Sequence, residues 1–103
     1  MSDLGEMTRQ AQEVRARFQR LQEELGEKMV EGSAGGGMVV VTANGRQELV
    51  SLRIEKEVVS PDDVGLLQDL IRAAVNDALV RSREMAASEM AKIAGGMLPP
   101  GIL

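Results

Sequence analysis

Two parts of this sequence contain residues that could bind a ligand or take part in a reaction. They are a glycine-rich stretch in the middle of the chain and the arginines near its start. The glycine-rich stretch, EGSAGGGMVVVTANG, occupies residues 31–45. A phosphate-binding loop needs glycines followed by Lys and Ser or Thr, and then a helix whose N-terminus faces the phosphate. Here a valine-rich strand pattern follows the glycines, so the stretch is interpreted as a turn between two strands.

Residues for catalysis and metal binding are scarce. The chain contains no cysteine and no histidine, which excludes disulfides, thiolate chemistry and the commonest neutral-pH base. Ser33 and Ser51 therefore lack a histidine to activate them, and helix capping accounts for the acidic pair Asp62 and Asp63. The sequence predicts a protein that is not an enzyme, with no catalytic residue, metal, cofactor or small-molecule substrate.

The arginines of the N-terminal segment have two possible roles. Helical spacing predicts that Arg9, Arg17 and Arg20 face away from an apolar stripe, with Arg15 to one side. One interpretation is a solvated surface in which Glu13 pairs with Arg17 and Glu24 with Arg20. Residues 1–26 contain four basic and five acidic side chains, which is consistent with such a neutral face. The other interpretation is a binding surface for an anionic partner.

Three segments of a single domain are expected to position these residues. Residues 1–26 form a long helix whose apolar stripe is narrow enough to be a seam against another helix, for instance one from a second copy. Residues 27–59 form a small antiparallel sheet. Residues 60–94 form a second helix, with Ser60 as its cap and Pro61 at its first position, and residues 95–103 form an extended tail after Gly95-Gly96. The predicted class is α+β, in the order α-β-β-β-α.

Within the sheet, Asn44-Gly45 predicts a two-residue hairpin loop, because both positions of a type I′ turn need positive φ. This loop places Val39 and Val41 on one face but points Leu49 to the other. Either a bulge shifts the register near Leu49, or the second face is covered too, for instance by a partner chain.

Composition favours an oligomer. The chain has seven methionines but a single aromatic residue, Phe18, although aromatic side chains usually supply the largest buried areas. The N-terminal residues do not resemble a signal peptide, and no apolar run reaches the roughly 20 residues that span a bilayer. A soluble, cytoplasmic protein without membrane contact is expected. The net charge of −4 argues against a broad nucleic-acid surface.

The pattern as a whole resembles the YbaB/EbfC family of bacterial nucleoid-associated proteins. The similarity lies in RQAQEVRARFQRLQEEL of the first helix, in EGSAGGGMVVVTANG, and in the terminal GMLPPG. The second helix contributes Leu70, Ala74, Asn76, Asp77 and Ala78. Together these segments extend over nearly the whole chain in the family's order.

The resemblance implies a tweezer-like homodimer whose N-terminal helices project as arms and bind double-stranded DNA with limited sequence preference. It also implies a nucleoid location and a part in chromosome organisation and gene regulation. Arg15 departs from the family pattern, in which glutamine is common at that position. The DNA-contacting residues that the resemblance implies, together with Arg15 beside them, are Arg9, Arg15, Arg17, Arg20, Arg81 and Arg83.

The alternative from the residues themselves is a protein–protein adaptor whose apolar arms grip a partner. Under both hypotheses the protein is not an enzyme. The two hypotheses differ in whether the ligand is duplex DNA.

Overall fold

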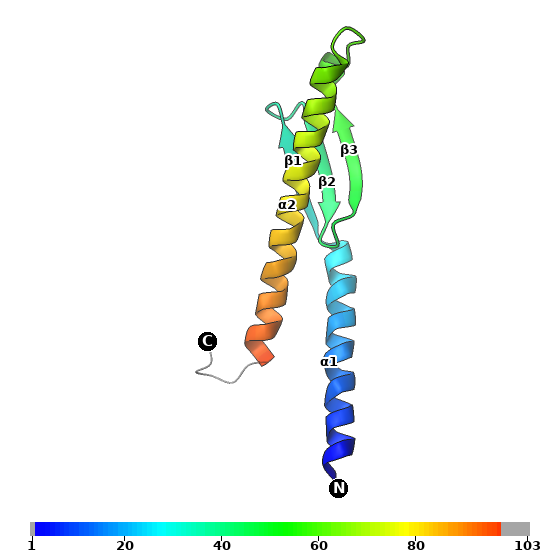
Figure 1. The fold of residues 1–103 in the computed structure, drawn as a ribbon, viewed down its shortest axis with the longest axis vertical. Helices are drawn as coiled ribbons and strands as arrows, with labels where there is room; N and C mark the ends of the chain where they lie inside the picture. The colour runs from blue at the N-terminus through cyan, green and yellow to red at the C-terminus, as the bar shows by residue number, and fades with distance from the viewer. Residues whose placement is uncertain (1, 98–103) are drawn as a thin grey trace.

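The chain folds into two long helices joined by a small sheet (Figure 1). The computed structural model describes residues 2–97. The elements are α1 (Ser2–Glu27), β1 (Met29–Ala34), β2 (Val39–Asn44), β3 (Leu49–Ile54), the 3₁₀ turn η1 (Lys56–Val58) and α2 (Val64–Met97). The strands form one antiparallel sheet in the order β1-β2-β3. The predicted α+β class and the α-β-β-β-α order are confirmed.

The molecule is far longer than a compact domain of its size. Its extents are 74 × 26 × 17 Å and its radius of gyration is 20.1 Å, whereas a compact chain of this length has about 13 Å. Figure 1 shows the reason: α1 leaves the sheet and projects alone past the end of α2. Residues 3–20 of this projecting part, which we call the arm, are all exposed.

The core lies between α2 and one face of the sheet. Val39, Val41 and Ala43 of β2 are fully buried, and they pack against Ala74 and Ala78 of α2. Because strand side chains alternate between faces, every second residue of β2 reaches this core. The two fully buried residues of α2, Ala74 and Ala78, are small, which lets the helix backbone come close to the strands. Leu70, Ile71 and Val75 of α2 pack against this core as well.

The closest approach is between α2 and Gly32 of β1. A Cβ atom built on Gly32 would lie 2.6 Å from the carbonyl oxygen of Ala74 and 2.6 Å from Cα of Ala78, and closer still to the backbone nitrogen of Ala78. These are backbone atoms, which cannot rotate away as a side chain can. Glycine is therefore required at position 32 for α2 to seat on the sheet.

The hairpin between β2 and β3 differs from the predicted two-residue loop. Asn44 is the last residue of β2, and three residues, Gly45 to Gln47, make the turn. The positive φ falls at Gln47 (63°) instead of at Asn44 or Gly45. The side-chain oxygen of Asn44 accepts hydrogen bonds from the backbone N–H groups of Arg46 and Glu48, at 2.9 and 3.1 Å. These bonds stabilise the longer loop, so the prediction of a type I′ turn was wrong.

A β-bulge decides the register of β3. Thr42 pairs with Ser51 but Ala43 pairs with Leu49, so Val50 is the extra residue. Of the two alternatives, the bulge is the one observed, and it returns Leu49 to the face that α2 packs on. Leu49 and Leu52 thus share a face with the core residues Ala43 and Val41.

The start of α2 also differs from the prediction. The helix begins at Val64, and Asp63 is its cap, since the Asp63 carboxylate accepts the backbone N–H of Leu66 at 3.1 Å. Ser60 instead stabilises a preceding turn, in which its hydroxyl oxygen accepts the N–H of Asp62 at 3.2 Å. Two capping residues compete in this segment, and the later one begins the helix.

The end of α2 extends further than predicted. The helix continues through Gly95-Gly96 to Met97, because neither glycine adopts the left-handed conformation that terminates a helix. The rest of the predicted tail, residues 98–103, lies outside the described residues. The glycines with positive φ are Gly35, Gly36 and Gly37, which form the predicted turn between β1 and β2.

Candidate nucleic-acid interface

The arm is fixed to the body at its C-terminal end. Leu21 and Leu25 are the buried residues of α1, at 2% and 3% exposure. The backbone N–H of Gly45 donates to the Leu25 carbonyl at 2.8 Å, which satisfies an acceptor that a helix end leaves open. A Cβ on Gly45 would lie 2.9 Å from this same carbonyl oxygen, so the hairpin tip and the helix end require glycine here.

A charged contact supports this joint. Lys28 Nζ, just after α1, lies 2.9 Å from a carboxylate oxygen of Glu89 on α2, and Lys92 lies 3.3 Å from the same oxygen. The hydrogen bond from Lys28, followed by that from Lys92, lowers the pKa of Glu89. The joint thus connects α1, the hairpin tip and α2, and it sets the direction in which the arm projects.

The arginines of the arm are largely unpaired. Arg9 forms an ion pair with Glu6 at 3.2 Å. The predicted pairs Glu13–Arg17 and Arg20–Glu24 are absent from the described part of the chain, in which no carboxylate lies within 4.0 Å of the Arg15, Arg17 or Arg20 guanidinium. These three guanidinium groups keep their hydrogen-bond donors available to an anionic ligand.

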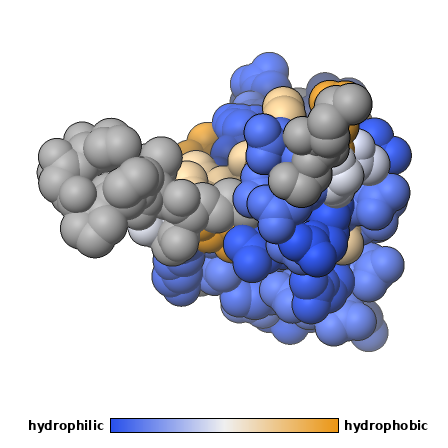
Figure 2. All heavy atoms as spheres, turned by 90° about the horizontal axis from the view of Figure 1, so that it is seen from below, coloured by the Kyte–Doolittle hydropathy of each residue, from blue (hydrophilic) through white to orange (hydrophobic). Residues whose placement is uncertain are grey.

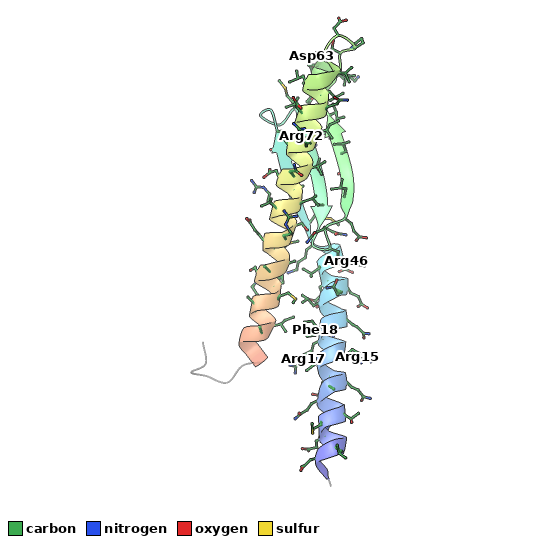
Figure 3. All side chains as sticks on the ribbon, viewed as in Figure 1. Arg15, Arg17, Phe18, Arg46, Asp63 and Arg72 are labelled. Carbon is green, nitrogen blue, oxygen red and sulfur yellow. The ribbon has the colours of Figure 1, made fainter. Side chains whose placement is uncertain are left out.

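The arginines also sit closer to the apolar stripe than predicted. Arg17 and Arg20 line a shallow hollow together with Leu21, Glu24 and Ile93 of α2, so neither of the two faces fully away from the stripe as predicted. Arg15 lines a separate hollow beside Phe18. Figure 3 shows Arg17 on the side of α1 nearer α2 and Arg15 on the other side. The arm therefore presents positive charge on both flanks of its apolar stripe.

The remaining two predicted residues are on the body, in the middle of α2. Arg81 Nε lies 3.2 Å from a carboxylate oxygen of Asp77, and the other oxygen of Asp77 accepts the backbone N–H of Ser33 at 3.0 Å. That backbone hydrogen bond, with the charge of Arg81, lowers the pKa of Asp77. Arg83 is exposed and has no ion pair within residues 2–97. The fold does not gather these two with the arm arginines.

One basic residue near the arm escaped the sequence analysis. Arg46, at the hairpin tip, lines a hollow with Gln22 of α1 and with Ala86 and Met90 of α2. Its Nε lies 3.9 Å from a carboxylate oxygen of Glu48. The tertiary contact between the hairpin and the C-terminal end of α1 places it there, and no local sequence pattern indicates that contact.

Other kinds of site find little support among the described residues. Within residues 2–97 no three acidic side chains gather as a metal site would require. Across the same residues neither helix has a stretch long and apolar enough to cross a membrane.

Comparison with known proteins places this architecture in a family. Residues 1–97 match the YbaB/EbfC DNA-binding family. A nucleoid-associated protein of Moorella thermoacetica is 57% identical over 101 residues, which cover 98% of this chain and 97% of that protein. A nucleoid-associated protein of Syntrophobacter fumaroxidans is 56% identical over 93 residues, covering 90% and 84%.

The fold is also similar to a solved structure. The crystal structure of the uncharacterized protein HP0035 from Helicobacter pylori matches with a TM-score of 0.69 and 26% identity, over 90% of this chain and 94% of that one. The match to the family over residues 1–97, and relatives more than half identical over nearly their full length, lead to one conclusion: this chain belongs to the YbaB/EbfC DNA-binding family.

Proposed function

We propose that this protein binds duplex DNA as a homodimer, with limited sequence specificity, and that it contributes to chromosome organisation and gene regulation in the nucleoid. The observation that carries the proposal, beside family membership, is the unpaired Arg15, Arg17 and Arg20 on a helix that projects from the body. Guanidinium groups on a projecting helix reach phosphates, which fix position on a duplex without reading bases. Residues 3–20 hold four arginines against Asp3, Glu6 and Glu13, so the acidic excess of the chain lies on the remaining residues.

The proposed contact surface consists of the arm with additional positions on the body. Its central residues are Arg15, Arg17 and Arg20, and Arg9 joins them once DNA competes with its exposed partner Glu6, since exposed pairs are weak. Arg46 at the base of the arm, and Arg81 and Arg83 on α2, are proposed as peripheral contacts.

The binding test is a titration of duplex DNA at increasing salt. Three unpaired arginines on each of two arms give up to six phosphate contacts, and each contributes about −0.9 to the slope of log K against log salt. We expect a slope near −5, so that affinity falls roughly a thousandfold from 50 to 200 mM salt. Unrelated duplex sequences should differ little. An absence of binding even at low salt would contradict the proposal.

The homodimer is proposed from uncovered apolar surface on the sheet. Since α2 packs over β1 and β2, the side chains of the edge strand β3 on that face remain open. Leu49, Val50 and Leu52 are 51–53% exposed. An exposed apolar edge strand favours aggregation, and a partner chain that covers the strand prevents this. Burying each Leu or Val contributes roughly 1.5–3 kcal/mol.

A substitution pair tests this interface. We expect Leu49→Lys with Leu52→Lys to convert the dimer to a monomer in sedimentation at micromolar concentration, because two charges would be buried against apolar groups. The matched control is Ser33→Lys with Ser51→Lys, on the opposite face of the sheet, which should remain dimeric. A monomeric parent protein would refute the dimer. If the Leu49/Leu52 variant stays dimeric, the dimer interface lies elsewhere on the molecule.

One observation favours a second candidate, an adaptor whose arms grip a partner protein. Leu4 and Met7, near the free end of the arm, are 71% and 63% exposed. DNA binding does not need these apolar side chains. If the DNA titration is negative at every salt concentration, the adaptor becomes the better explanation.

A further inference from the structure

The apolar stripe of the arm has no partner in the single chain. The stripe is made by Leu4, Met7, Ala11, Val14 and Phe18, whose spacing alternates three and four residues, as in a coiled coil. All five are exposed. Figure 3 shows Phe18 near the level at which α2 ends, so the rest of the stripe lies beyond the cover of α2.

Only the base of the stripe meets α2. Phe18 lines an apolar groove with Met90, Ile93 and Ala94 of α2. In Figure 2, which views the molecule of Figure 1 from below, most of the coloured side chains are hydrophilic, and apolar atoms form a patch among them. Because a short helix is marginal alone and is stabilised mainly by packing of its apolar face, the free stripe has the character of a helix-pairing surface.

The charges beside the stripe indicate the partner and its direction. Asp3 and Arg17 occupy equivalent coiled-coil positions on the same flank. When two copies of the arm pair antiparallel, with Met7 opposite Ala11 of the other copy, Asp3 of each lies opposite Arg17 of the other, which gives two attractive pairs. In a parallel pairing the flanking partners are Asp3 with Thr8, Gln10 with Arg15 and Arg17 with Gln22, so no opposite charges meet.

We infer that the arm is a second self-association surface, which pairs antiparallel with the arm of another copy and so links one dimer to the next. Leu4 of one arm packs on Val14 of the other, and Met7 on Ala11. Ala11 is small, which lets the helices approach closely at the centre. Phe18 stays in the groove against α2.

The linkage leaves part of the arm free for another ligand. Arg9 lies on the outer side of the helix, and Arg20 lies beside the hollow at the base of the arm, outside the paired residues 4–14. If DNA binding is as proposed, associated arms would hold two duplexes near each other. That last step rests on the proposed function, whereas the pairing of the arms does not.

Sedimentation velocity over a range of protein concentrations tests the association. Two heptads bind weakly, so we expect the mass average to rise above that of the dimer between about 10 and about 200 µM. The variant Met7→Glu with Val14→Glu should abolish the rise. The control Gln12→Glu with Ala16→Glu adds the same charge to the outer face of the same helix. Its mass average should still rise with protein concentration as that of the parent does. Circular dichroism verifies that each variant folds.

Disulfide trapping tests whether the two paired arms run antiparallel or parallel. The chain has no cysteine of its own, so every crosslink comes from the introduced residues. Met7→Cys with Ala11→Cys should crosslink the arms of separate dimers, because position 7 of one arm faces position 11 of the other in the antiparallel arrangement. A parallel pair would crosslink this double variant too, through equivalent positions, so the single variant decides the direction. Ala11→Cys alone should not crosslink, since it meets itself only in a parallel pair.

Each other outcome overturns the inference in a recognisable way. Crosslinking of Ala11→Cys alone would refute the antiparallel direction. A parent protein whose mass stays constant over the whole range would refute self-association. Association that appears only after truncation behind Met97 would assign the stripe to the chain's own last residues. Loss of the dimer itself in the Met7/Val14 variant would make the arm the primary interface and would contradict the proposed β3 interface instead.

Discussion

Replacing Arg15, Arg17 and Arg20 together by alanine is expected to lower affinity for duplex DNA by roughly two to three orders of magnitude at low salt and to flatten the salt slope to the part that Arg9 and the peripheral contacts supply. The physical reason is counterion release, because every phosphate that the protein no longer neutralises keeps its condensed cation. The loss should be similar for all duplex sequences, since phosphate contacts carry no base information. Fluorescence anisotropy at several salt concentrations, with two unrelated duplexes, measures both quantities.

The control for this variant removes the same charge from the body. Arg53, Lys56 and Arg72 lie outside the arm and outside the joint, and Arg72 is engaged with Asp69. Their triple alanine variant has the same net charge as the arm variant, so it separates local contact from the overall field. An equal loss in the two variants would show that net charge governs binding, and the assignment of the arm would be wrong.

Substitution of Gly32 by alanine is expected to destabilise the fold by about 3 kcal/mol or more. Overpacking usually costs about 1–3 kcal/mol, and here the added methyl group meets the backbone of Ala74 and Ala78, which cannot relax by a rotamer change. Either α2 lifts from β1, or the strand bends. Urea unfolding at a fixed protein concentration gives the change in free energy.

Gly65 provides the matched control for this substitution. It lies in the first turn of α2, is exposed, and a Cβ there meets no atom within 4 Å. Gly65→Ala should leave stability unchanged or raise it by up to about 1 kcal/mol, because alanine is the better helix former. A Gly32→Ala variant as stable as the parent would mean that α2 does not pack on β1 at this distance.

Local pattern was enough to predict most of the fold. The three- and four-residue spacing of apolar residues predicted α1, the alternation around the valine run predicted strands, and Gly35 to Gly37 predicted the first turn, where all three have positive φ. These features depend on residues that are close together in the chain. The periodicity of the apolar residues and the residue types in the turns therefore predict them directly. The sequence also posed the choice at Leu49 correctly, as a bulge or a covered second face.

The errors arose where two local signals compete or where a distant contact decides. Ser60 and Asp63 can each cap a helix, and the turn made by Ser60 leaves the cap to Asp63. The spacing of Glu13 and Arg17 permits an ion pair, but spacing does not make one form. Exposed pairs contribute so little free energy that the side chains have no strong preference for that geometry.

By itself, the sequence determined the order of elements, the absence of cysteine and histidine chemistry, and the presence of arginines along a helix with an apolar stripe. The tertiary structure alone decided that α2 packs mainly over β1 and β2, that the backbone of α2 touches Gly32, and that Gly45 caps α1 and so aims the arm. These contacts join residues tens of positions apart. Their energies depend on how closely backbones approach, which no periodicity along the chain encodes.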